Sequence, residues 1–210
     1  MINCLIVRKF WGRALEMSNK SEEILKAASL CFARYGYEKT TLDDIGRQVR
    51  LNKASLYYYF KNKESIYTEV IYRETDDFLN SVVEKLSSVA GCREKLIVYF
   101  TERLQYIETA LNFKQLSADS VQKIAPLFGE VYNRIIEKEA ASLARILDEC
   151  VKTGEIVPCE TRRVARNILT ITEAVTNKID CQVETPEAYR KALEEITFML
   201  SLLFDGLKRK

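Results

Sequence analysis

The chain has 210 residues, of which 47% are hydrophobic and 30% are charged, and its formal net charge is only +2. This composition excludes an intrinsically disordered chain and fits one or two globular domains. The chain contains no histidine, which excludes histidine-dependent catalysis and histidine-based zinc sites. No apolar run approaches the ~20 residues that cross a bilayer, so we expect a soluble protein with no membrane partner.

The first sixteen residues, MINCLIVRKFWGRALE, are apolar and basic. They lack the long apolar core and the small-residue cleavage site of a secretory signal. Met17 follows directly, and a regular amphipathic pattern begins at Ser18. We therefore treat residues 1–17 as an extension that is either a start-site artefact or a flexible basic arm able to touch DNA phosphates.

Helical spacing dominates the rest of the chain, which has only 7 glycines and 3 prolines, so we predict an all-α fold. The first helix is expected over residues 22–35, with Ser21 as its N-cap and Gly36 just beyond its end. Its core face is expected to carry apolar residues at helical spacing: Ile24, Ala28, Cys31, Phe32 and Tyr35.

Thr41 and Asp44 resemble a capping box that starts a short helix, which reaches about Val49. Residues 50–52 then form a tight turn, and Asn52 is a good N-cap for a third helix over residues 53–60. This order of helix, three-residue turn and helix is followed by a fourth, longer helix over residues 63–89, capped by Asn62.

The third helix contains the aromatic run of the segment SLYYYFKNKE. Leu56 and Phe60 share one face at i, i+4 spacing and are expected to pack inward. Tyr57 and Tyr59 flank this face, where a ring lies against the domain while its hydroxyl reaches a phosphate oxygen. Lys63 begins the next helix, so its ammonium and the free N–H groups of that helix converge on one anion site.

The run TTLDDIGRQVRLNKASLYYYFKNKESIY, with the preceding ILKAASLCFARYGYEK, resembles the DNA-binding domain of the tetracycline-repressor (TetR) family over about residues 20–70. The resemblance implies an N-terminal three-helix helix-turn-helix domain, which a long helix joins to a helical ligand-binding and dimerisation domain. We accordingly expect the DNA-binding domain at residues 18–65 and the second domain at residues 66–210.

The same resemblance assigns DNA contacts to individual residues. It implies base contacts by Lys53, Ala54, Ser55 and Tyr58. It implies phosphate contacts by Thr41, Tyr57, Tyr59 and Lys63, to which Arg50 adds a charge near the DNA. Arg50 occupies a turn position where the family usually has glycine, so either the turn is built differently or Arg50 adopts a strained left-handed conformation.

Charge is distributed unevenly along the chain. Residues 18–63 contain nine basic and five acidic side chains, a net charge of +4. The extension adds +2, which leaves −4 for the remainder of the chain. A basic N-terminal part on an acidic remainder is expected for a regulator that meets nucleic acid through its N-terminal domain alone.

The remainder is predicted to form helices after Gly91, near residues 119–125, 127–153 and 161–181, and from Pro186 onward. Aromatic side chains there are candidates for an apolar effector pocket, although each also suits a plain core: Tyr99, Phe100, Tyr106, Phe113, Phe128 and Tyr132. We expect no cofactor and no metal.

The last two predicted helices carry an apolar face that is wide for one protomer. Either the final helix is a central core helix, or the two helices form a two-fold bundle in a homodimer, which the family resemblance favours. The candidate interface residues are Ile168, Ile171, Val175, Ile196, Leu200, Leu203 and Leu207.

Six cysteines lie scattered, with no C-x-x-C pair, and we expect reduced thiols in a cytoplasmic protein. The alternative is a thiol switch at Cys150, Cys159 or Cys181.

These patterns predict a homodimeric transcriptional repressor that binds a pseudo-palindromic operator and is released by a small-molecule effector. The alternative from another class is an all-α enzyme or an interaction module, but no acidic pair or activated nucleophile is placed by spacing.

Overall fold

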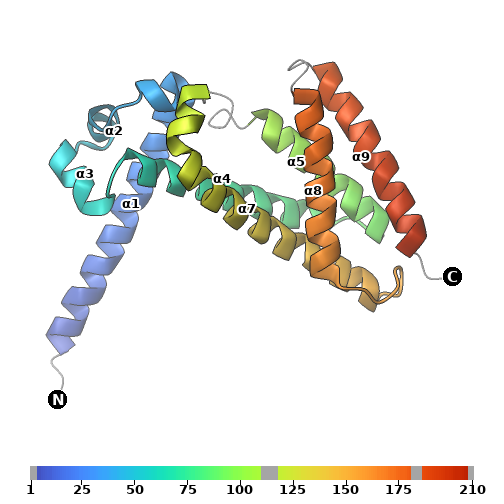
Figure 1. Cartoon of the computed structure of the whole chain (residues 1–210). Coiled ribbons are helices and arrows are strands. Elements are labelled where there is room, and N and C mark those ends of the chain that lie inside the picture. Colours follow the sequence, from blue (N-terminus) through green and yellow to red (C-terminus); the bar gives the residue numbers. More distant parts are fainter. Residues whose placement is uncertain (1–3, 110–117, 181–185, 208–210) are drawn as a thin grey trace. The chain divides into compact units, whose positions relative to one another are not determined.

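The computed structural model describes residues 4–109, 118–180 and 186–207, and every regular element in these ranges is a helix, as predicted (Figure 1). In chain order the helices are α1 (Cys4–Lys39), α2 (Leu42–Val49), α3 (Lys53–Tyr59), α4 (Lys63–Leu86), α5 (Cys92–Thr109), α7 (Ala118–Lys152), α8 (Thr161–Asp180) and α9 (Pro186–Leu207). Within the described residues, none of these helices combines the length and the apolar character that a bilayer span requires.

Two helices are longer than the sequence pattern predicted. Helix α1 begins at Cys4, so it includes most of the extension, and Ser21 lies inside the helix instead of capping it. Helix α7 is one continuous helix where two were expected, with Pro126 in its interior. Proline removes one backbone donor from a helix, and here this loss does not end the helix.

The chain divides into two compact units, which we call the head and the body. The head consists of Met1–Glu74 and Leu111–Phe128, and the body of Thr75–Ala110 and Gly129–Lys210. The division falls within α4 because Tyr67 packs on head aromatics, whereas Phe78 belongs to the body core. It therefore lies later in the chain than the boundary after residue 65 that the sequence suggested.

The head core differs from the predicted stripe at one position. Ile24, Ala28 and Phe32 are buried as expected, but Tyr35 is 45% exposed. Gly36 has a φ of 78°, which only glycine adopts readily, and the chain changes direction there. Tyr37 is buried instead, with its ring centroid 4.9 Å from that of Tyr67.

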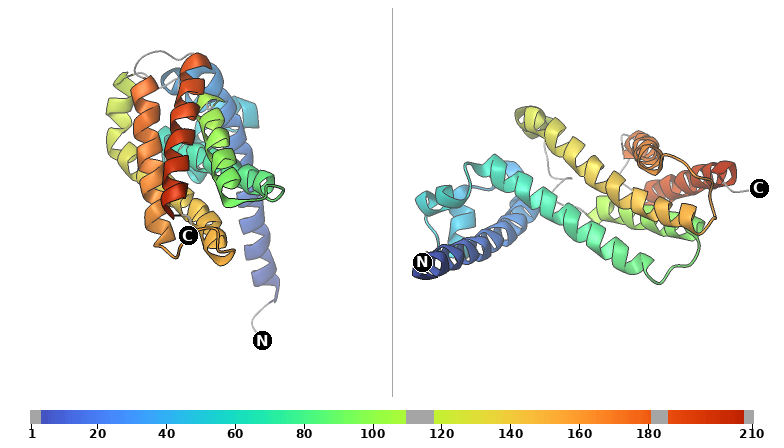
Figure 2. Two further views of the ribbon diagram at one scale, coloured as in Figure 1. Left: turned by 90° about the vertical axis from the view of Figure 1, so that its right-hand side faces the viewer. Right: turned by 90° about the horizontal axis from the view of Figure 1, so that it is seen from below.

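The body core is formed by faces of α4, α5, α7, α8 and α9. Figure 2 shows α9 lying between α5 and α8, and α9 contacts both. Helix α4 contributes Phe78, Val82 and Leu86, which are all buried in this core.

Candidate nucleic-acid interface

Helix α2 begins with the predicted capping box. The Asp44 N–H donates to Thr41 Oγ1 at 3.2 Å, and the Thr41 N–H donates to an Asp44 carboxylate oxygen at 2.9 Å. The hydrogen bonds from Thr41 hold the pKa of Asp44 below its usual range. Because the Thr41 hydroxyl also donates to Asp44 at 2.6 Å, it must exchange that bond for any contact with a phosphate.

The turn after α2 depends on one left-handed residue. Arg50 has φ 55° and ψ 41°, so the left-handed alternative for this position is confirmed. The turn is closed by a hydrogen bond of 2.9 Å from the Leu51 N–H to the Gly46 carbonyl. The Arg50 side chain is exposed beside this turn.

Gly46 is a functional position that the sequence pattern did not identify. A Cβ atom added to it would lie 2.4 Å from the Leu51 carbonyl oxygen, which is far inside contact distance. The close approach of the turn to α2 therefore requires glycine at this position. The signal in the sequence is a glycine inside a helix, where its low propensity indicates a packing reason.

Helix α3 presents one face outward. The Asn52 side chain accepts a hydrogen bond from the Ser55 N–H at 2.7 Å, which confirms it as the N-cap. Leu56 is 1% exposed and anchors the helix in the head core. The remaining side chains of α3 are exposed or half-buried: Lys53, Ala54, Ser55, Tyr57, Tyr58 and Tyr59.

The tyrosines of α3 are not equivalent. Tyr57 and Tyr58 are 49% and 57% exposed. Tyr59 is half-buried, and its ring meets that of Tyr58 edge to face with centroids 5.3 Å apart. This contact limits the freedom of both rings, so α3 offers a pre-organised aromatic surface next to Lys53.

Lys63 has partners within the head. Its ammonium donates to the carbonyls of Tyr37 and Thr40 at 2.8 and 3.1 Å and lies 4.2 Å from the centroid of the Tyr37 ring. It therefore caps the carboxyl end of α1. The Tyr37 hydroxyl donates a hydrogen bond of 3.1 Å to the Glu64 carboxylate. Burial is the main cause that raises the pKa of Tyr37, and the negative charge of Glu64 is the second. A phosphate contact by Lys63 would have to share its ammonium with these carbonyls.

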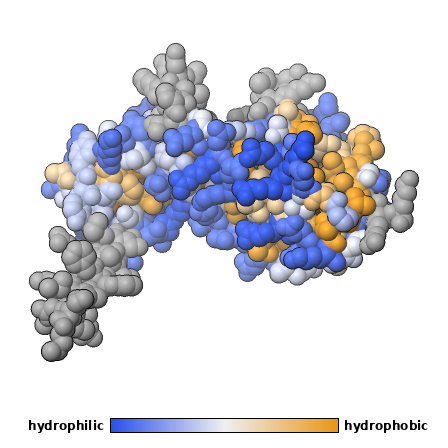
Figure 3. All heavy atoms as spheres, turned by 60° about the horizontal axis from the view of Figure 1, so that its bottom comes forward, coloured by the Kyte–Doolittle hydropathy of each residue, from blue (hydrophilic) through white to orange (hydrophobic). Residues whose placement is uncertain are grey.

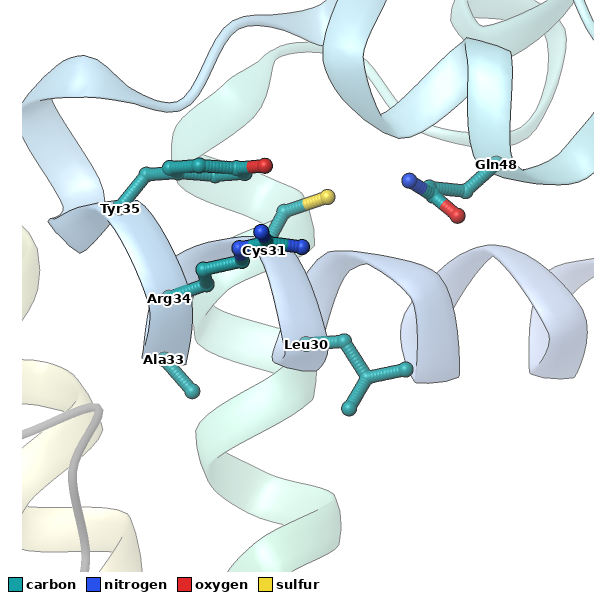
Figure 4. A pocket seen from close by; sticks show the side chains of 6 residues that line it. All are labelled: Leu30, Cys31, Ala33, Arg34, Tyr35 and Gln48. Carbon is teal, nitrogen blue, oxygen red and sulfur yellow. The ribbon is translucent and has the colours of Figure 1, made fainter.

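A hollow of about 400 Å³ lies elsewhere on the head, between α1 and α2. Figure 4 shows Cys31, Tyr35 and Gln48 facing it. Burial, followed by the charge of Asp44, raises the pKa of the Cys31 thiol, so this thiol is less reactive than an ordinary cysteine.

Four of the candidate effector aromatics, Tyr99, Phe100, Tyr106 and Tyr132, lie in the body and form two groups. Tyr99 and Phe100 are buried, with ring centroids 5.2 Å apart, and Tyr106 stacks on Phe78. Tyr132 is 36% exposed. Phe113 lies outside the described residues, and the side chain of Phe128, in α7, is also outside them.

A buried ion pair lies beside these rings. Arg103 Nε donates to the Glu139 carboxylate at 2.6 Å, and the two residues are only 6% and 5% exposed. Burial alone would lower the pKa of Arg103, but Glu139 raises it overall. Sequence reasoning missed this pair, although Arg103 falls on the apolar stripe of α5, seven residues after Leu96.

The hydroxyl groups of two tyrosines lie near the pair. The Tyr99 hydroxyl is buried and has no hydrogen-bond partner in the described part of the chain. Burial, and after it the charge of Glu139, raises its pKa. The Tyr132 hydroxyl donates to Glu173, and burial followed by this bond raises its pKa as well. This part of the body therefore combines buried aromatic rings with a polar cluster.

The expected dimerisation residues also separate. Ile168, Ile196 and Leu200 are 1%, 1% and 2% exposed and belong to the core of the body itself. Ile171 is 47% exposed, and Val175, Leu203 and Leu207 are half-buried.

Two further apolar side chains, Phe198 and Leu202 on α9, are 63% and 59% exposed. With Ile171 they line an apolar groove between α8 and α9. Figure 3 shows hydrophobic surface gathered over this part of the body. We call the surface formed by Ile171, Val175, Phe198, Leu202 and Leu203 the α8–α9 face.

Of the six cysteines, the structure pairs Cys92 and Cys150 in a disulfide. This corrects the expectation that all the thiols are reduced. Cys31 and Cys159 are free, and Cys181 lies outside the described residues. Within the described part of the chain, no group of three or more metal-ligating side chains gathers to hold a metal ion.

Comparisons with known proteins agree with this geometry. Residues 24–70 match the family described as bacterial regulatory proteins, tetR family. The chain is 28% identical over 167 residues to the fatty acid metabolism regulator protein of Bacillus subtilis, a match that covers 75% of this chain and 82% of that protein.

Over 62 residues the chain is 42% identical to IcaR of Staphylococcus aureus, the helix-turn-helix negative regulator of the biofilm operon icaADBC; the match covers 30% of this chain and 33% of IcaR. A solved transcriptional regulator from Cytophaga hutchinsonii shares the fold, with a TM-score of 0.74 and 24% identity over 90% of this chain and 98% of that one. The segment that matches the tetR family, residues 24–70, contains α2, its left-handed turn and α3, so over the helix-turn-helix the chain is similar to the regulators of that family.

Proposed function

We propose that the protein is a homodimeric repressor that binds a pseudo-palindromic operator through α3 and is released by a small-molecule effector. The observation that carries this proposal is the outward face of α3, which presents Lys53, Ala54 and Tyr58 while Leu56 anchors the helix. A helix held in this way by a preceding helix and turn fits the major groove, where its N-terminal residues reach base edges.

Specific residues carry the proposed contacts. The proposed base contacts come from Lys53, Ala54 and Tyr58, which are exposed on α3, and from Ser55, which is half-buried. The phosphate contacts come from residues around this helix: Thr41, Arg50, Tyr57, Tyr59 and Lys63. Arg50 is the best supported of these cations, because it is exposed and the turn holds it beside α3.

The proposed dimer forms through the α8–α9 face. Ile171, Phe198 and Leu202 are large apolar side chains on these two adjacent helices, and each is about half exposed or more. Their contact with water costs free energy. A second copy of the same face would bury them in an isologous interface. Such a dimer presents two α3 helices to half-sites spaced by about 34 Å or a multiple of it.

The dimer is tested with Phe198→Asp. Because Phe198 is 63% exposed in one protomer, the variant should keep its helical content but sediment as a monomer. Operator affinity should fall by 100-fold or more, since one half-site cannot supply the effective concentration that two linked sites supply. A dimeric Phe198→Asp protein would refute the interface.

The proposed effector site is the aromatic and polar cluster around Tyr99 and Arg103. Because a relative's name refers to fatty acid metabolism, fatty acids of increasing chain length form the first compounds to titrate, alongside apolar compounds without a carboxylate. Binding is measured by thermal shift and operator release by fluorescence anisotropy. Tyr99→Phe removes a hydroxyl that has no hydrogen-bond partner among the described residues, so a loss of response without a loss of stability would support the site.

The central experiment is a selection of operator DNA from a pool of genomic fragments, followed by a gel-shift titration of the selected sequence. Tyr58→Ala should reduce affinity for this sequence by about 1–3 kcal/mol and relax its base preference. Tyr35→Ala removes another exposed tyrosine of the head, outside α3, and serves as the matched control. Equal losses in the two variants would contradict readout by α3.

As a DNA-binding regulator, the protein acts in the cytoplasm, and we assign no catalytic role to its residues.

A further inference from the structure

The disulfide between Cys92 and Cys150 joins two helix ends that lie 58 residues apart in the chain. Cys92 is the first residue of α5, and Cys150 lies in the last turn of α7. Their Cα atoms are 5.6 Å apart, a separation that permits a disulfide without movement of the backbone. Both residues belong to the body core, together with Leu96 and Leu147 of the same helices.

Hydrogen bonds hold the two helix ends together independently of the disulfide. The Cys92 N–H donates to one oxygen of the Glu155 carboxylate at 2.8 Å, and the Thr153 hydroxyl donates to the other at 3.0 Å. Glu155 thus ties the turn after α7 to the start of α5. Because core packing and this carboxylate remain after reduction, the two sulfur atoms stay within reach of each other in the dithiol form.

A hollow gives small molecules access to the pair. It measures about 280 Å³ and is lined by both cysteines, with charged side chains around them: Lys95, Glu149, Lys152 and Glu155. One water molecule occupies about 30 Å³ of liquid, so the hollow is large enough for a hydroperoxide. The two cysteines are therefore almost fully buried, but a small molecule can reach them through this hollow.

A DNA-binding regulator works in the cytoplasm, which is a reducing compartment, so its disulfide requires an explanation. Disulfides in a reducing cytoplasm are rare, and those that occur are usually transient, catalytic or redox-sensing. We propose that Cys92 and Cys150 are a reversible redox site and that its state sets the affinity of the protein for its operator. This proposal rests on the proposed operator-binding function.

The chemistry requires a hydroperoxide as oxidant. One cysteine, as its thiolate, attacks the distal oxygen of ROOH; the O–O bond breaks, a sulfenic acid forms, and the leaving oxygen takes up a proton to give ROH. The second thiol then attacks the sulfenic sulfur, the S–S bond forms, and water leaves. The sum converts two thiols and ROOH into the disulfide, ROH and water. A dithiol returns the pair to thiols by exchange and becomes a disulfide itself.

The redox state reaches the DNA-binding head through α4. This helix begins at Lys63 in the head and ends at Leu86, and residues 87–91 connect it directly to Cys92. The disulfide thus links Cys92, at the body end of this connection, covalently to Cys150 at the end of α7, and reduction removes this link. Because α4 is one continuous helix, a change in the freedom of its body end alters the set of orientations available to its head end.

The test compares wild-type protein treated with hydrogen peroxide and with dithiothreitol, after excess reagent has been removed. Mass spectrometry of proteolytic fragments should find Cys92 joined to Cys150 in the oxidised sample. Operator affinity, measured by anisotropy, should differ at least threefold between the two forms. Since redox state and DNA binding are linked, operator should shift the midpoint potential of the pair, by about 30 mV for a tenfold difference in affinity.

Variants and outcomes separate this proposal from the function it rests on. Cys92→Ala and Cys150→Ala should each abolish the redox effect on operator affinity, whereas Cys31→Ser and Cys159→Ser should retain it. Operator affinity that is equal in the two forms of wild type, despite a complete disulfide, would overturn the switch while leaving operator binding intact. Failure of both forms to bind any selected operator would instead refute the proposed function.

Discussion

The head and the body build their candidate sites in different ways. In the head, the caps that begin α2 and α3 join groups close in sequence: Thr41 pairs with Asp44 and Asn52 with Ser55, each three residues apart. In the body, the decisive pairs are distant: Arg103 meets Glu139 across 36 residues and Cys92 meets Cys150 across 58. Local backbone chemistry therefore positions the DNA-binding surface, whereas tertiary packing creates the polar cluster of the body.

This difference predicts that the body is most sensitive to the loss of one charged partner. Glu139→Ala leaves the Arg103 guanidinium buried without its carboxylate, so the free energy of unfolding should fall by about 3–5 kcal/mol. The measurement is urea denaturation followed by circular dichroism. Replacing both residues with apolar ones, as Arg103→Met with Glu139→Leu, should recover most of the loss, because no uncompensated charge remains.

The matched control for Glu139→Ala is Lys138→Ala. Lys138 pairs with Asp76 at 2.7 Å near the surface, where such pairs contribute about 0–1 kcal/mol. If Glu139→Ala and Lys138→Ala cost the same free energy, burial of the Arg103–Glu139 pair has no energetic role and the contrast between the two units fails.

The head should be most sensitive at Gly46. In Gly46→Ala the new Cβ atom would lie 2.4 Å from the Leu51 carbonyl oxygen, which is backbone and cannot rotate away. Overpacking of this kind costs about 1–3 kcal/mol, and it should also displace α3 and reduce operator affinity. Both effects are measured on one protein preparation, by denaturation and by gel shift.

Gly129→Ala is the contrasting substitution, since outside the backbone of α7 no atom of the described residues lies within 4 Å of its added Cβ. It should raise the free energy of unfolding by about 0.5–1 kcal/mol through helix propensity alone. If Gly46→Ala also raised the free energy of unfolding, the turn would have to relax around the added methyl group.

The same contrast explains which features the sequence predicted. The helix-turn-helix and its caps follow from signals within a few residues, and the structure agrees with them. The sequence left two alternatives open at Arg50, and the structure shows the left-handed one. The Arg103–Glu139 pair, the disulfide and the continuity of α7 depend on partners that helical periodicity does not identify. Tyr35 was misplaced for a related reason, because the glycine after it redirects the chain and puts Tyr37 in the core instead.

A third prediction separates two lysines of the head. Lys53 is exposed on α3, so Lys53→Ala should leave the free energy of unfolding within about 0.5 kcal/mol of wild type while weakening operator affinity and relaxing sequence preference. Lys63→Ala removes hydrogen bonds to the carbonyl end of α1 and should cost about 1–3 kcal/mol of stability.

Salt dependence then decides whether Lys63 also contacts a phosphate. Each phosphate contact adds about one unit to the slope of log affinity against log salt concentration. If Lys63→Ala lowers stability but leaves both the affinity and the slope of the folded protein unchanged, Lys63 is a structural cap alone and its assignment to phosphate must be withdrawn.

The smallest expected effect concerns Arg50, where stability and binding should move in opposite directions. Its φ of 55° lies in the left-handed region, which costs a non-glycine residue about 1 kcal/mol relative to glycine. Arg50→Gly should therefore raise the free energy of unfolding by about 0.5–1 kcal/mol, measured as an increase in the urea midpoint at constant slope. The same variant loses a cation beside α3, so operator affinity should fall and the salt slope should decrease by about one unit.

Arg50→Lys keeps the charge and the strain, and it should match wild type in stability and nearly in affinity. If Arg50→Gly gains stability and binds operator as tightly as wild type, the arginine is tolerated in this turn without serving the DNA, and the strain at this position has no function in binding.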